Sequence, residues 1–215
     1  MSDTLAFIKQ HKIIAIMRKL PPEQLIQTSQ ALYDGGIRLM EITFDQKGDP
    51  NVTVESIKTL ISHFGDKLLV GAGTVMSLEQ LDMAYKAGAK YIISPDCNTA
   101  VIEKTKELGL VSMPGALTPT EIATAYNHGA DIVKLFPAGV FGVDYVKAVR
   151  APVSHVPLAA VGGITENNIS DFIAAGISSF GLGSNIVRAD LIKEGKFDEI
   201  TALAALYVKK LEAVK

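Results

Sequence analysis

The stretch Asp131-Ile132-Val133-Lys134-Leu135-Phe136-Pro137 is a short apolar run with one lysine at its centre. Nearly continuous apolar residues are typical of a strand in a parallel sheet, because such strands are covered on both faces. Burial of a lysine disfavours its charged ammonium form. An uncharged amine can attack a carbonyl group and form a Schiff base. The alternative is that Lys134 lies at the strand end and reaches water.

Seven other short apolar runs share this character, and amphipathic segments separate them. The eight predicted strands cover residues 13–17, 39–43, 68–71, 91–94, 111–114, 132–136, 157–161 and 179–182. Two of the intervening helices begin with a predicted capping box, Ser77 with Gln80 and Thr118 with Glu121. Glycines just before the next strand predict the helix ends, at Gly35-Gly36, Gly88, Gly109, Gly129 and Gly176.

Eight strands alternating with helices in 215 residues predict a closed (β/α)8 barrel, or TIM barrel. We expect one domain over residues 1–215, with a short helix at its N-terminus. The competing fold is a doubly wound open sheet. That fold would usually show a glycine-rich turn after the first strand, where this chain has Arg18-Lys19-Leu20-Pro21-Pro22.

Composition narrows the classes of partner. The chain is 48% hydrophobic, carries a net charge of −2 and has no basic tract, so we expect no nucleic-acid or membrane partner. Its single cysteine, Cys97, and the lack of a signal-like or membrane-spanning run predict a cytoplasmic protein. The four histidines are scattered without metal-ligand spacing, so we predict no metal site. We also predict no cofactor. A small-molecule substrate is the class of partner that remains.

The C-terminal ends of barrel strands are where chemistry gathers in this fold. The side chains and turns predicted there are Arg18, Glu41, Thr74, Pro95, Lys134, Phe136, Gly162-Gly163 and Gly183-Ser184. Glu41 lies in another apolar strand. Either it is a buried carboxylate that only pairs with Lys134 or Arg18, or it is a general acid and base whose pKa is raised by burial.

Glycine-rich turns follow the last two predicted strands, at Gly162-Gly163 and at Gly183-Ser184. Barrels often bind phosphate there, through backbone N–H groups and a helix N-terminus. A third glycine-rich segment, residues 71–75, lacks the lysine of a phosphate loop, and we expect a close-packed turn that presents Thr74 inward. The charges at Asp45, Lys47 and Asp49 are expected to be solvated.

With these residues in place, the chain resembles the 2-keto-3-deoxy-6-phosphogluconate (KDPG) aldolases, also called 4-hydroxy-2-oxoglutarate (KHG) aldolases. The resemblance runs from about Ile13 to the final helix. Its motifs are Glu41-Ile42-Thr43, Gly71-Ala72-Gly73-Thr74-Val75, Ile93-Ser94-Pro95, Pro114-Gly115, Val133-Lys134-Leu135-Phe136-Pro137-Ala138, Gly162-Gly163-Ile164 and Gly183-Ser184.

The resemblance implies a metal-free class I aldolase, usually a homotrimer, in which Lys134 forms the Schiff base and Glu41 moves protons. It implies that Thr74, Pro95 and Phe136 line the pyruvate end and that the two late turns hold a phosphate. Many members carry an arginine where this chain has Asp45. Others carry one at the end of the first strand, and on that pattern Arg18 binds the carboxylate.

The predicted reaction cleaves a 2-keto-3-deoxy-6-phospho sugar acid to pyruvate and glyceraldehyde 3-phosphate. The same chemistry would split 4-hydroxy-2-oxoglutarate into pyruvate and glyoxylate. The sequence does not choose among KDPG, its galactonate epimer and the unphosphorylated acid. Two alternatives stay open at this point: a phosphate-binding barrel isomerase or epimerase, and a non-catalytic sugar-phosphate sensor.

Overall fold

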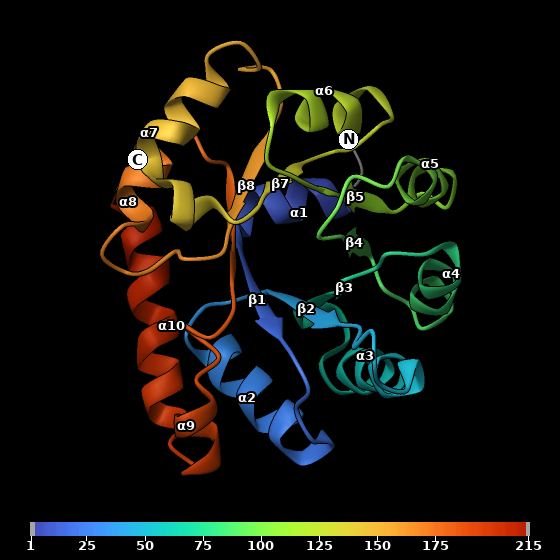
Figure 1. Cartoon of the computed structure of the whole chain (residues 1–215). Helices are drawn as coiled ribbons and strands as arrows, with labels where there is room; N and C mark the ends of the chain where they lie inside the picture. The colour runs from blue at the N-terminus through green and yellow to red at the C-terminus, as the bar shows by residue number, and fades with distance from the viewer. Residues whose placement is uncertain (1–2, 214–215) are drawn as a thin grey trace.

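The computed structural model describes residues 3–213 and confirms the predicted barrel. Parallel strands stand at the centre with helices around them (Figure 1). The strands are β1 Ile13–Met17, β2 Leu39–Thr43, β3 Leu69–Gly73, β4 Tyr91–Ile93, β5 Val111–Met113, β6 Gly115–Ala116, β7 Val133–Leu135, β8 Leu158–Val161 and β9 Ser179–Leu182. The α-helices are α1 Asp3–His11, α2 Pro22–Asp34, α3 Pro50–Phe64, α4 Leu78–Lys86, α5 Thr99–Glu107, α6 Pro119–Asn127, α7 Ala138–Arg150, α8 Ile169–Ala174, α9 Ala189–Lys193 and α10 Phe197–Glu212, and a 3₁₀ turn, η1, covers Gly65–Lys67.

The barrel closes at a bend in one strand. The strand order runs β5-β4-β3-β2-β1-β9-β8-β7-β6, and only Pro114 separates β5 from β6. Proline has no N–H to donate to a neighbouring strand, which favours a break in the pairing there. The Pro114 carbonyl still accepts a hydrogen bond from the Lys134 amide, at 2.8 Å. The single strand predicted over residues 111–114 is therefore two short strands that act as one.

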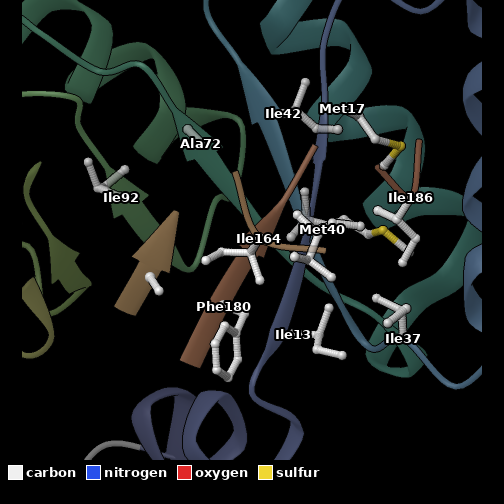
Figure 2. Close-up of a cluster of buried hydrophobic side chains, with 14 of the residues drawn as sticks. Ile13, Met17, Ile37, Met40, Ile42, Ala72, Ile92, Ile164, Phe180 and Ile186 are labelled. Atoms are coloured by element: carbon white, nitrogen blue, oxygen red, sulfur yellow. The ribbon is translucent and has the colours of Figure 1, made fainter. Parts of the chain in front are cut away.

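Side chains alternate between the two faces of each strand and build two apolar layers. One layer lies between the strands and the helices, and Figure 2 shows part of it, including Met17, Ile37, Met40 and Ile42. The other layer fills the barrel itself. Its buried members are Leu5, Ile8, Ile14, Leu39, Tyr91, Ile93, Val111, Met113, Ile132 and Ala159.

The first and last helices, α1 and α10, cover different parts of the barrel. Leu5 and Ile8 of α1 belong to the interior layer, so this helix covers the N-terminal end of the barrel. α10 packs against α2 and α8 and completes the ring of helices (Figure 1). Among the described residues, no helix has the length and apolar character needed to cross a bilayer. The opposite end of the barrel, at the carboxyl ends of the strands, stays free for a site.

The local signals are confirmed with two exceptions. The glycines predicted at helix ends, Gly36, Gly88, Gly109, Gly129 and Gly176, have positive φ. Thr118 and Glu121 form the predicted capping box. Ser77 accepts from the Gln80 amide, but the Gln80 side chain does not return the bond, so that box is incomplete. The turn predicted at Gly71-Ala72-Gly73 is wrong, because β3 continues to Gly73.

The close packing of the Tyr91 ring against Gly71 explains why β3 contains a glycine at this position. A Cβ atom on Gly71 would lie 2.2 Å from the ring of Tyr91. Tyr91 is fully buried, and its hydroxyl donates to the Met40 carbonyl at 2.7 Å. The ring therefore occupies the space that a side chain at position 71 would need.

We predict that Gly71→Ala lowers the free energy of unfolding by roughly 1–3 kcal/mol, the usual effect of overpacking a core. Urea denaturation measures this directly. Tyr91→Leu vacates the ring's space, so the double variant should lose less stability than the sum of the two single variants. Strict additivity would contradict the proposed contact.

Candidate active site

A pocket of about 500 Å³ opens at the C-terminal ends of the strands. The ten residues that the sequence singles out all line it: Arg18, Glu41, Thr74, Pro95, Lys134, Phe136, Gly162, Gly163, Gly183 and Ser184. They come from seven different strand ends, so the closed barrel is what brings them together.

Lys134 faces the barrel interior because of strand alternation. Its neighbours Val133 and Leu135 belong to the layer under the helices, while Ile132 belongs to the interior layer. The lysine is only 7% exposed, which excludes the reading of a strand-end lysine in water. Burial lowers the pKa of its ammonium group, and the nearby Glu41 carboxylate opposes that shift.

Glu41 faces the same interior for the same reason. Met40 and Ile42 point toward the helices, and the glutamate is 2% exposed. Burial raises the pKa of this carboxyl, and the charges of Lys134 and Arg18 oppose that shift. The ion pairs among residues 3–213 include neither Glu41 nor Lys134. Both groups are thus held near the pocket without neutralising one another in a direct pair.

Two neighbours shape the space around this pair. A Cβ atom on Gly73 would lie 1.8 Å from Glu41 Oε1, so only glycine leaves room for the carboxyl group. The Lys134 Nζ lies 5.0 Å from the centre of the Phe136 ring, which is within cation–π range. The amine therefore has an apolar wall on one side and the open pocket on the other.

The two late glycine turns are joined to each other and to the start of α7. Gly162 and Gly163 have φ of 86° and 75°, in the left-handed region that favours glycine. The Gly139 amide donates to the Gly162 carbonyl at 2.7 Å. The Asn185 side chain donates to the Ile164 carbonyl at 2.5 Å and so connects the second turn to the first.

Charged side chains follow strands β1 and β2. Arg18 is exposed and lines the pocket. Asp45, expected to be a solvated loop charge, is partly exposed, and its carboxylate pairs with Lys19 Nζ at 2.8 Å. A hydrogen bond from Lys19 lowers the pKa of Asp45. Asp49 is exposed, as expected, and it also caps α3 by accepting a hydrogen bond from the Asn51 amide.

Sequence reasoning missed part of the lining. The additional lining residues are Ile16, Val161, Ile164, Gly181, Leu182, Asn185 and Val187. Strand alternation could have found Ile16, Val161 and Gly181, which share the inward parity of Glu41 and Lys134. Asn185 carries no signal beyond its place after Ser184. Within residues 3–213, no group of three or more His, Cys, Asp or Glu side chains is arranged to hold a metal ion.

Comparison with known proteins is informative over almost the whole chain. Residues 5–203 match the sequence profile of the family described as KDPG and KHG aldolase. The chain belongs to this aldolase family. A 2-dehydro-3-deoxy-6-phosphogalactonate aldolase from Escherichia coli (strain K12) is 34% identical over 91% of this chain and 94% of its own length.

Two further members show the spread of the family. A 2-dehydro-3-deoxy-phosphogluconate aldolase from Treponema pallidum is 33% identical, over 92% of each chain. The crystal structure of a KDPG aldolase from Legionella pneumophila superposes with a TM-score of 0.86 at 26% identity, covering 95% of this chain and 97% of that one. That crystal structure holds pyruvate captured at low pH as a covalent carbinolamine intermediate.

Replacing both buried ionisable groups, in Glu41→Gln/Lys134→Met, should raise the free energy of unfolding at neutral pH by about 1–4 kcal/mol. The lysine pKa is lowered on folding, so the unfavourable free energy of burying this side chain falls as pH rises toward the ordinary pKa of 10.5. The glutamate pKa is raised on folding, so the unfavourable free energy of burying this side chain falls as pH decreases toward the ordinary pKa of 4.5. The gain should therefore shrink toward both ends of the pH range.

Chemical denaturation across a pH series measures this difference. Asp66→Asn/Lys67→Met, in an exposed turn, is the matched control and should show no such dependence. A gain that stays constant with pH would mean that packing, not charge, accounts for it.

Proposed function

We propose that the protein is a class I aldolase that cleaves a 2-keto-3-deoxy-6-phospho sugar acid to pyruvate and glyceraldehyde 3-phosphate. The observation that carries the proposal is a buried lysine of lowered pKa beside a buried glutamate of raised pKa, both at one pocket. A pair of groups whose pKa values are shifted toward neutrality by their environment is suited to nucleophilic and acid–base work.

In the proposed mechanism, the uncharged amine of Lys134 attacks the C2 ketone of the substrate. Glu41 in its acid form gives a proton to the carbinolamine hydroxyl, which leaves as water, and the resulting iminium ion withdraws electrons from the C3–C4 bond. Glu41 takes the proton of the C4 hydroxyl, the C3–C4 bond breaks and the aldehyde departs. The enamine left on Lys134 is protonated at C3 by Glu41, and hydrolysis of the iminium releases pyruvate.

The remaining pocket residues would hold the two ends of the substrate. Arg18 and Thr74 would bind the carboxylate, with Pro95 and Phe136 packed beside the pyruvate carbons. The turns at Gly162-Gly163 and Gly183-Ser184 would bind the phosphate. Fixing both ends places the reacting bond between them, which is how positioning lowers a barrier.

The substrate preference and the assembly are finer points of the proposal. Identities of 34% and 33% to the galactonate-type and gluconate-type enzymes do not separate the two phosphorylated substrates. We propose a phosphorylated acid as the main substrate and 4-hydroxy-2-oxoglutarate as a secondary one, because two late turns fit a phosphate. A pyruvate-release assay with all three acids ranks the substrates.

By resemblance to the family, we propose a homotrimer that acts in the cytoplasm.

Lys134→Ala should abolish both pyruvate release and the covalent trapping of pyruvate by borohydride, because no amine remains to form the imine. Glu41→Gln should still trap pyruvate but turn over roughly 10²–10⁴-fold more slowly, since acid–base help is lost. Lys47→Ala, at an exposed loop lysine, is the control and should behave as the parent does. Trapping that persists in Lys134→Ala would overturn the proposal.

Turnover of a sugar phosphate without trapping in the parent would favour an isomerase or epimerase, and binding without turnover would favour a sensor.

Ser184→Asp tests the proposed phosphate end. A carboxylate beside the bound phosphate should raise KM for the phosphorylated acids roughly tenfold or more, through repulsion of like charges. The pyruvate concentration that half-saturates trapping should not change, because pyruvate does not reach this turn. Steady-state kinetics with Ser184→Ala as the neutral control measure the effect. An equal loss with pyruvate would place Ser184 at the wrong end of the site.

A further inference from the structure

Thr74 has a backbone conformation that its side chain disfavours. Its φ is 56°, in the left-handed region, where a β-branched residue is an outlier. Such conformations persist only where the surroundings hold them, and they concentrate at functional sites. Thr74 lines the pocket that contains Glu41 and Lys134. The contacts that hold this residue therefore bear on the site.

Two glutamines hold the strained turn, Gln46 in the loop after β2 and Gln80 in the first turn of α4. Gln46 Nε2 donates to the Thr74 carbonyl at 2.9 Å. Gln80 Nε2 in turn donates to Gln46 Oε1 at 3.0 Å. Gln80 Oε1 accepts from the Met76 amide at 2.8 Å, on the far side of the turn. This is the reason that the capping box expected at Ser77 is incomplete: the Gln80 side chain is engaged in this clamp.

The clamped turn is coupled to the acid–base group. Gly73, which precedes Thr74, leaves room for the Glu41 carboxyl only because it has no Cβ. The Gly73 carbonyl accepts from the Phe44 amide at 2.9 Å, two residues before Gln46. A shift of the Thr74 turn would thus displace the backbone on which the Glu41 carboxyl lies.

We propose that Gln46, supported by Gln80, is a positioning residue that holds Thr74 in its left-handed conformation and so orients it toward the keto-acid end of the substrate. Gln46 is exposed and is absent from the pocket lining, so it acts through Thr74 and not by touching substrate. The inference rests on the proposed function, because it assumes that Thr74 binds the keto acid that Lys134 attacks.

The test measures the pyruvate concentration that half-saturates borohydride trapping. Gln46→Ala should raise this concentration roughly threefold to tenfold, as expected for the loss of one neutral hydrogen bond. The melting temperature should change little, because Gln46 is an exposed residue. Gln30→Ala, at an exposed glutamine on α2 whose side chain donates to Asp34, is the matched control and should have no effect.

Two combinations separate positioning from other roles. Glycine adopts the left-handed region without strain, so Gln46→Ala should have no further effect in a Thr74→Gly background. Gln80→Glu keeps the acceptor for Met76 but loses the donor to Gln46. Its effect should be of the same kind as that of Gln46→Ala, and the double variant should be no worse than the larger single effect.

The outcomes are distinct. An equal rise for Gln46→Ala in both backgrounds would mean that Gln46 contacts substrate directly and would overturn the inference. No rise in the native background, or additive effects of Gln46→Ala and Gln80→Glu, would also overturn it. Failure of the parent protein to trap pyruvate would instead overturn the proposed function, and this inference with it.

Discussion

Burial of two ionisable side chains inside one barrel is the constraint on which the rest of this structure depends. Strand alternation turns Glu41 and Lys134 inward, above an apolar layer that excludes water from below. Burial moves both pKa values toward neutrality, and the charge of each group limits the shift of the other. Without a direct ion pair between them, both groups remain available at the pocket.

The surrounding residues make room for these groups instead of neutralising them. The absence of a side chain at Gly73 leaves room for the Glu41 carboxyl group, and the absence of one at Gly71 leaves room for the ring of Tyr91. The exposed Arg18 and the two late glycine turns line the same pocket. The pocket thus combines two buried ionisable groups with an exposed arginine and two glycine-rich turns.

Much of this arrangement could be predicted from the sequence, because apolar runs and strand parity are local properties. The bounds of β1, β2 and β9 match the predictions, and all ten predicted site residues meet at one pocket. The break at Pro114 and the extension of β3 through Gly73 could not be read locally, since both depend on neighbouring strands. The clamp of Gln46 and Gln80 was also missed. Gln46 and Gln80 are 34 positions apart and give no signal until the fold brings the loop after β2 next to the start of α4.

The central claim is that Lys134 is the amine that joins covalently to a keto acid. The most direct test is to reduce the native protein with borohydride in the presence of pyruvate, digest it, and locate the modified residue by mass spectrometry. The account predicts one adduct per chain, on Lys134, that saturates with pyruvate concentration. An adduct on a different lysine, or none in a protein that still releases pyruvate, would contradict it.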